Sequence, residues 1–127
     1  MTLYSSTFIF AKGSFDAAFH QLDEIIAKTA QSLPGYLGEE SWENPTTGLL
    51  CNVYYWDSMA ALEQLMQHPA HREAKARQGQ WLAGYQVVIA QVLATYGDGR
   101  IHHPLAGLVP MRGLAAPPTP GLAAPPA

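Results

Sequence analysis

A row of polar side chains along one predicted helix is the first feature of this sequence that could do chemistry. His71, Lys75 and Gln78 are spaced at i, i+4 and i+7, so they share one face of a helix. The imidazole group has an ordinary pKa near the working pH, which makes His71 a candidate general base. This helix face either meets water or lines a polar pocket, and the spacing is compatible with both.

Two histidines three residues apart, His68 and His71, also have a spacing that could hold a metal ion. The pair spans a helix start marked by Pro69, however, and no third ligand has a recognisable spacing. A solvated helix cap is the better account of His68, and we expect no metal site. We expect the other histidines to lie at the surface or in a disordered tail: His20, His102 and His103.

Aromatic residues are concentrated on the segments around that helix face. The chain has three Trp and six Tyr, and their N–H and O–H groups need partners wherever they are buried. Asn52, in the middle of a predicted strand, needs a partner too. Such residues are common in plain cores, but their concentration favours a cavity between sheet and helices. We expect its lining to include Trp42, Asn52, Tyr54, Trp56, Trp81 and Tyr85, together with His71 and Lys75.

The composition excludes several classes of protein. The 127 residues are 48% hydrophobic and 13% charged, as in one globular domain. Seven basic residues against ten acidic ones, without a basic cluster, make nucleic acid and anionic membranes unexpected partners. The sequence lacks a G-x-S-x-G motif, a phosphate-binding glycine loop and paired C-x-x-C motifs. One cysteine, no signal-peptide pattern and no long apolar run predict a cytoplasmic protein.

Residue periodicity predicts the elements that must position these side chains. Alternation predicts strands over 3–12, 36–43, 49–56 and 85–96. Helical spacing predicts one helix from a Ser14 cap to Leu33, a short one from Asp57-Ser58 to His68, and one from Pro69 to about Leu82. The order β-α-β-β-α-β is the α+β, ferredoxin-like arrangement, with helices on one face of a four-stranded sheet.

The predicted strand at 49–56 is apolar or aromatic on both faces. An antiparallel sheet with one open face normally alternates apolar and polar residues. The helices can cover only one face, so we expect a second copy of the chain to cover the other, adding about 25 cal/mol per Å² of buried apolar area. Polar Asn52 favours its own set of side chains for the pocket face.

The chain divides into a domain at 1–97 and a tail at 98–127. Seven of the ten prolines follow Gly97, and the sequence Gly-Leu-Ala-Ala-Pro-Pro at 113–118 is repeated at 121–126. Such low-complexity composition cannot build its own core. Docking on a partner subunit and disorder are both open for this tail.

Four segments together resemble the antibiotic biosynthesis monooxygenase domain family. They are Pro34-Gly35-Tyr36-Leu37-Gly38, the run from Tyr55 to Leu62, the run from His68 to Lys75, and Trp81 with Tyr85-Gln86-Val87. The resemblance covers nearly all of residues 3–97. It implies a dimeric α+β barrel, in which two sheets pack face to face and each sheet has a pocket beneath its own helices. Characterised members include cofactor-independent oxygenases of aromatic polyketides and quinols, and haem-degrading enzymes.

The resemblance implies a cofactor-independent monooxygenase acting on a small aromatic or quinol-like compound. His71 would be its base, Asn52 would orient an oxygen atom, and the aromatic side chains would stack on a flat substrate. The haem-degrading branch uses Asn, Trp and a His ligand where this chain has Ser6, Leu65 and Lys75, which opposes haem cleavage. Two alternatives stay open: a non-catalytic dimeric protein that binds small molecules or serves a stress response, and a haem-binding or haem-degrading protein with a rearranged site.

Overall fold

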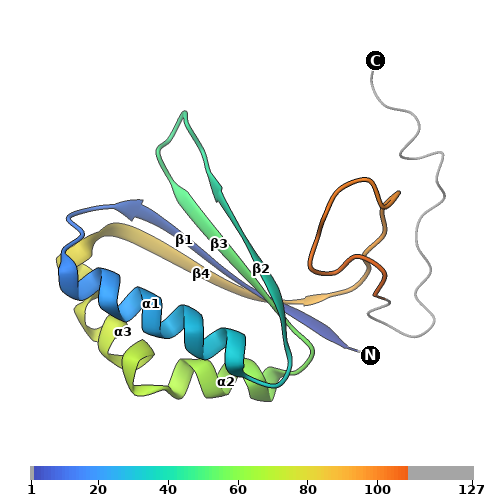
Figure 1. Cartoon of the computed structure of the whole chain (residues 1–127). Helices are drawn as coiled ribbons and strands as arrows, with labels where there is room; N and C mark the ends of the chain where they lie inside the picture. Colours follow the sequence, from blue (N-terminus) through green and yellow to red (C-terminus); the bar gives the residue numbers. More distant parts are fainter. Residues whose placement is uncertain (1, 109–127) are drawn as a thin grey trace.

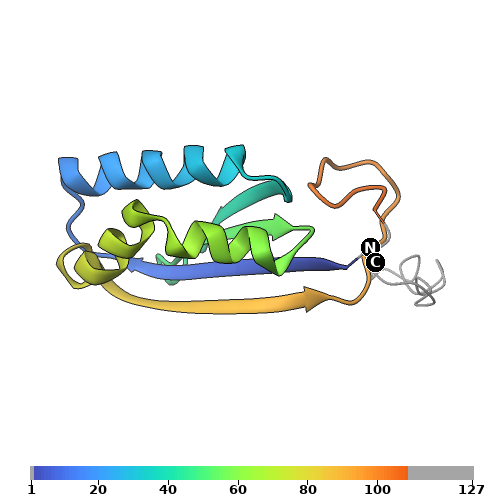
Figure 2. The same ribbon diagram turned by 90° about the horizontal axis from the view of Figure 1, so that it is seen from below.

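The computed structural model describes residues 2–108, which form one antiparallel sheet with helices on one of its faces (Figures 1 and 2). The strands lie side by side in the order β2-β3-β1-β4. This order confirms the predicted ferredoxin-like α+β fold. The elements along the chain are β1 (Leu3–Lys12), α1 (Ala17–Ser32), β2 (Tyr36–Glu43), β3 (Leu50–Trp56), α2 (Met59–Gln67), α3 (Pro69–Trp81) and β4 (Leu82–Val92).

Local signals explain where most helices begin. Ser58 accepts a hydrogen bond from the backbone N–H of Ala61, 3.2 Å away, and so caps α2 as predicted. The cap of α1 is Asp16 and not Ser14, because Asp16 has the extended backbone of a cap and its carboxylate accepts from the N–H of Phe19 at 2.9 Å. The last strand also begins earlier than predicted, at Leu82, directly after α3.

Strand register gives the sheet two different faces. Ser6 lies opposite Tyr54 on one side and opposite Ile89 on the other, so these side chains share a face. Trp56 belongs to the same face and is fully buried in a core with residues of α1 and α2. The face that carries Asn52, Tyr54 and Trp56 is therefore the helix-covered face, as the sequence predicted.

The opposite face, which we call the outer face, is partly covered by the chain after β4 (orange in Figure 1). The imidazole Nε2 of His103 lies 2.6 Å from Glu40 Oε2, and its ring centre lies 5.2 Å from that of Tyr55. Leu105 is 2% exposed. His103 is therefore a surface residue, with its side chain 33% exposed, and it is held in place by these contacts. The two repeats at 113–118 and 121–126 lie outside the described residues.

The edge strand β4 is the least covered element of the sheet. Val87 and Ile89 on its helix side are 47% and 41% exposed, and Val88 on the outer face is 46% exposed. Large apolar side chains are therefore exposed on both faces of this edge strand. No helix in the described part of the chain combines the length and the apolar character needed to cross a membrane.

Candidate functional site

A cavity of about 410 Å³ lies between the sheet and the helices, where the sequence predicted one. Every helix and every strand except β2 contributes to its walls. A volume of this size suits a small organic ligand, and most of the lining is apolar or aromatic, as in typical ligand pockets. The apolar lining residues include Phe8, Phe10, Phe19, Leu22, Ile26 and Leu65.

The structure brings six of the eight predicted site residues together around this cavity. The six come from strands β3 and β4 and from α3, so residues far apart in the sequence meet at one place. They are Asn52, Tyr54, His71, Lys75, Trp81 and Tyr85. The other two, Trp42 and Trp56, lie elsewhere.

Trp56 lies behind the cavity wall. It is 0% exposed, and its Nε1 donates a hydrogen bond of 3.1 Å to the hydroxyl of Ser6, which does line the cavity. Trp42 pairs with Cys51 in the sheet and is therefore on the outer face, where it is 65% exposed. The expectation that these two tryptophans line the cavity is wrong. For Trp42 the reason is that the register between β2 and β3 decides which way it points.

His71 contributes an imidazole group to the wall of this cavity. Its Nδ1 is buried and makes no hydrogen bond within the described part of the chain. Burial lowers the pKa of the His71 imidazole, and the nearby ammonium group of Lys75 lowers it further; the backbone of Met66 acts in the opposite direction. His71 is therefore neutral at pH 7, and a neutral imidazole can take a proton from a bound molecule.

Asn52 supplies a fixed polar group on the floor of the cavity. Its side-chain oxygen Oδ1 accepts a hydrogen bond of 2.9 Å from the hydroxyl of Ser41 on the neighbouring strand. This contact orients the amide and leaves its NH₂ group able to donate to a ligand.

Acidic and phenolic groups gather at the α1 side of the cavity, and of its lining residues there Tyr54 was predicted from the sequence but Asp23 was not. Asp23 of α1 lines the cavity, and partial burial raises the pKa of its carboxyl group. Asp23 lies four residues after Phe19 and three before Ile26, so it interrupts the apolar stripe of the helix. That interruption is the signal that could have revealed it.

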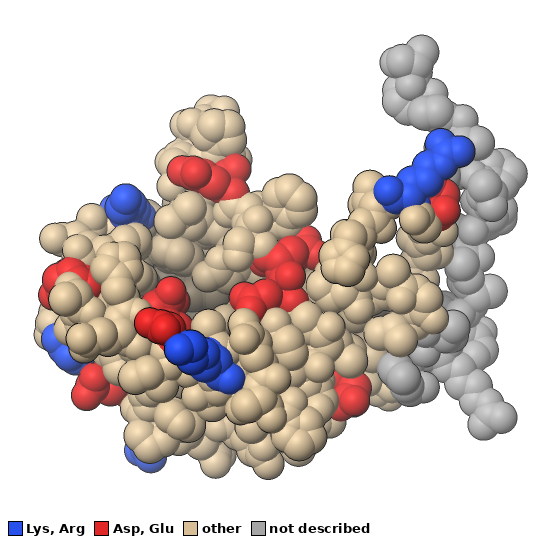
Figure 3. All heavy atoms as spheres, viewed as in Figure 1, with Lys and Arg blue, Asp and Glu red and all other residues tan. Residues whose placement is uncertain are grey.

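Two tyrosines near this side of the cavity remain protonated. Burial, followed by the negative charge of Glu39, raises the pKa of Tyr54 far above its usual range. The same causes raise the pKa of Tyr36 to about 12, and its hydroxyl donates to Glu39 Oε1 at 3.1 Å. Figure 3 shows acidic side chains gathered between α1 and β2. The two sides of the cavity therefore differ in charge: carboxylates lie on the α1 side, and His71 and Lys75 lie on the α3 side.

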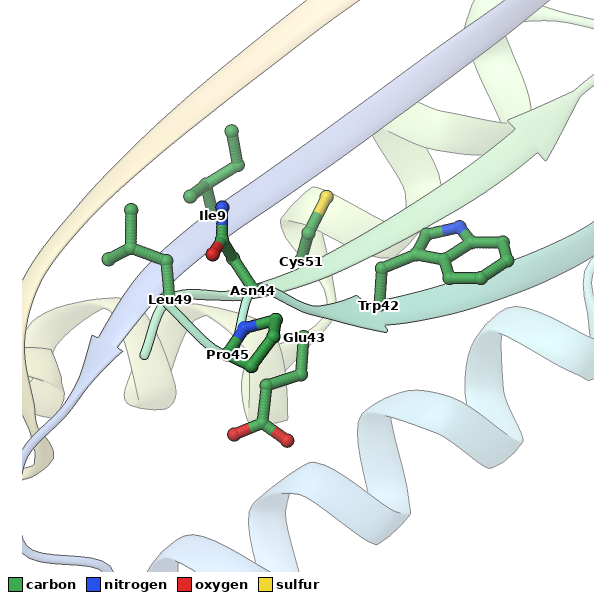
Figure 4. A pocket seen from close by; sticks show the side chains of 7 residues that line it. All are labelled: Ile9, Trp42, Glu43, Asn44, Pro45, Leu49 and Cys51. Atoms are coloured by element: carbon green, nitrogen blue, oxygen red, sulfur yellow. The ribbon is translucent and has the colours of Figure 1, made fainter. Parts of the chain in front are cut away.

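A second hollow, of about 480 Å³, opens on the outer face beside the β2–β3 turn (Figure 4). It is shallower than the first cavity, and its lining includes neither a histidine nor an asparagine from a strand. Its lining consists of Ile9, Trp42, Glu43, Asn44, Pro45, Leu49 and Cys51. The cavity beneath the helices is therefore the candidate functional site.

His68, the first member of the histidine pair, has a structural role at the start of α3. Nδ1 of His68 accepts a hydrogen bond of 3.1 Å from the N–H of Ala70, which makes His68 the cap of α3. Among residues 2–108, no three side chains of the His, Cys, Asp or Glu type come together in a way that could hold a metal ion.

Known proteins resemble this chain in sequence and in fold. No protein-family model matches the chain. It is 32% identical over 90 residues to the uncharacterized protein YqjZ of Bacillus subtilis (strain 168), a match that spans 70% of this chain and 78% of YqjZ.

Two solved structures show the same fold. One is SnoaB, a cofactor-independent oxygenase from Streptomyces nogalater, with a TM-score of 0.58 at 11% identity over 79% of this chain and 100% of SnoaB. The other is a putative antibiotic biosynthesis monooxygenase from Chloroflexus aurantiacus J-10-fl, with a TM-score of 0.51 at 18% identity over 76% of this chain and 99% of that one. The predicted resemblance to antibiotic biosynthesis monooxygenases is thus confirmed at the level of fold.

Proposed function

Because the chain belongs to the family of YqjZ and has the fold of antibiotic biosynthesis monooxygenases, we propose that it is a monooxygenase that needs no bound cofactor. Its substrate is a small aromatic or quinol-like compound. One observation carries the proposal: a partly buried His71, whose pKa is lowered by burial, shares an aromatic-lined cavity with Asn52. This cavity is large enough for a ligand of two or three fused rings.

The chemistry requires a substrate that can itself give an electron to O₂. His71 accepts the proton of a ring hydroxyl group, and the resulting phenolate transfers one electron to O₂. The radical pair combines at a ring carbon to form a hydroperoxide. Loss of water then leaves a quinone, so one oxygen atom enters the product and the other leaves as water. The amide of Asn52 stabilises the oxygen anion, and the apolar walls exclude bulk water.

Replacement of His71 by Gln tests this proposal. We expect oxidation to slow by about 10²-fold to 10⁴-fold, because the variant lacks the base. The measurement is O₂ uptake with a panel of two- and three-ring phenols and hydroquinones, combined with ¹⁸O incorporation from ¹⁸O₂. In the unmodified protein the rate should fall with acidification only below the usual histidine pKa, since burial lowers the pKa of His71.

His20→Gln is the matched control, since His20 is an exposed residue of α1 that does not line the cavity. It should oxidise the same compounds at the original rate. Uptake that continues unchanged in the His71 variant would remove His71 from the mechanism. If ligands bind the unmodified protein but none is oxidised, the non-catalytic binding function is the better description.

The residues present do not match the haem-degrading site of the related family. Ser6, Leu65 and Lys75 all line the cavity, and none of them supplies an imidazole or thiolate ligand for iron. We therefore derive no step through haem. Titration with hemin should produce no shifted Soret band, and a saturable shift at micromolar protein would instead favour haem binding.

We also propose that the working form is a homodimer that pairs through the outer face. Support comes from exposed Val88 of β4 and from the apolar residues Ile9, Cys51 and Val53, which the helices leave uncovered. In such a dimer each protomer keeps its own cavity, because the cavity lies on the other face of the sheet.

A further inference from the structure

Lys75 is the one basic side chain among the residues that line the cavity. It follows His71 by four residues on α3, so both side chains point toward the same side of that helix. Lys75 is an exposed residue that contributes to the cavity lining, and its side chain makes no ion pair or hydrogen bond with the described part of the chain. A cation beside an apolar cavity thus has no partner within the protein.

Two of the other basic side chains of the helices have partners, whereas Arg72, which has none among the described residues, does not line the cavity. Lys28 pairs with Glu24 at 2.8 Å. Arg77, two residues after Lys75, lies 3.7 Å from Glu73 and 4.7 Å from the ring centre of Trp81. The lack of a partner therefore distinguishes Lys75 from its neighbour on the same helix, and an anionic ligand in the cavity could complete a charge-assisted hydrogen bond.

We propose that Lys75 makes the cavity selective for anionic aromatic compounds, by binding a carboxylate or an acidic phenolate oxygen of the ligand. The inference rests on the proposed function, since it assigns a substrate class to the same cavity. Apolar side chains hold the rings, and the anionic group of the ligand lies at the α3 side.

The α1 wall of the cavity supports this orientation. Asp23 lies on the α1 side, where a carboxylate would repel a second anion. The Tyr54 hydroxyl, next to Glu39, completes a side that suits a neutral hydroxyl group of the ligand better than a charged one. A ligand with an acidic group at one end and a hydroxyl group at the other matches both sides.

Binding of an anion at Lys75 should also change the basicity of His71. The positive charge of Lys75 disfavours the imidazolium form of His71, and a bound anion would offset that charge. The pKa of His71 then rises on binding, and the complex takes up protons at pH values between the free and the bound pKa. The other titratable groups facing this site are Asp23 of α1, Tyr54 of β3, Tyr85 of β4 and the capping His68.

Calorimetric titration of the full chain with 2-naphthoate and 2-naphthamide tests the selectivity. The two probes have nearly the same shape, and only the first is charged. We expect naphthoate to bind at least about tenfold more tightly, as a charge-assisted hydrogen bond implies. Lys75→Met should abolish the preference and Lys75→Arg should keep it. Arg72→Met is the matched control, because Arg72 lies on α3 but does not line the cavity.

Titration at pH 6.5 in two buffers with different ionisation enthalpies measures the proton uptake. Proton uptake should accompany naphthoate binding and should disappear in both Lys75→Met and His71→Gln. Equal affinity for the two probes, a preference that survives in Lys75→Met, or no binding of either probe at millimolar concentration would overturn the inference. Selective binding without any O₂ uptake would leave the Lys75 assignment standing while the monooxygenase proposal fails; O₂ uptake without selectivity would do the reverse.

Discussion

Trp42 and Trp56 have the same side chain in very different surroundings. Trp56 packs its ring near those of Tyr36 and Tyr54, with no exposed surface, and donates its N–H to Ser6. Trp42 stands on the outer face, where its N–H donates to Glu40 at 2.7 Å. The first therefore belongs to the core that supports the cavity, and the second contributes little to it.

Truncation of each tryptophan to alanine should separate these roles. Trp56→Ala leaves a large hole in the core and should lower the free energy of unfolding by about 3–5 kcal/mol. Trp42→Ala should lower it by clearly less, because Trp42 is 65% exposed on the single chain and leaves no hole in the core. Urea unfolding followed by circular dichroism at one fixed protein concentration measures both. Similar losses in the two variants would contradict the assignment of the two faces.

The sequence predicts the placement of a site residue where that placement depends on local spacing, and it fails where the placement depends on strand register. His71 and Lys75 could be placed on one face because helical spacing is a local property. Trp42 could not, because its direction depends on the register of a hairpin. Nor could Asp23, because the side of a helix that borders a cavity depends on how that helix packs on the sheet.

At the scale of elements, the junction of α2 and α3 positions the candidate base. His68 has extended backbone angles, since a residue before proline avoids the helical region. Its N–H closes α2 by donating to the carbonyl of Leu65, and its Nδ1 opens α3 by accepting from Ala70. This bend sets the direction of α3 and thereby turns His71 and Lys75 toward the cavity.

Substitution of His68 tests this junction. His68→Ala removes the cap of α3 and should lower the free energy of unfolding by about 1 kcal/mol. His68→Asn should retain most of the stability, because the asparagine side-chain oxygen can accept the same hydrogen bond. Thermal and urea unfolding compare the two variants with the original chain. Equal stability of the alanine variant would show that the cap contributes nothing.

At the scale of the whole molecule, other segments of the chain cover some parts of the sheet and leave other parts exposed. The helices cover β1 and β3 on one face, and the segment around His103 and Leu105 covers part of the outer face near Tyr55. Edge strand β4 and the middle of the outer face have no such cover. A second copy of the chain would supply it, with a gain of about 25 cal/mol for each Å² of apolar surface buried.

A charge placed on the outer face should separate the protomers. Val88→Asp puts a carboxylate into the proposed interface. The mass of this variant in solution should therefore fall to that of one chain, 13.8 kDa. Gln21→Asp adds the same charge on the exposed side of α1 and should keep the dimer mass. Sedimentation or light scattering gives the masses. A single-chain mass for the unmodified protein would rule out the homodimer.

The sequence by itself determined the order of elements and the cap at His68, and polar Asn52 favoured the face of β3 that the helices cover. These features depend on spacing, alternation and capping, which act between residues close together in the chain. Only the tertiary structure decided the outward direction of Trp42, the contact of His103 with Glu40 and the charge difference between the two sides of the cavity. Each of these depends on strand register or on contacts between residues distant in sequence, and no local pattern encodes them.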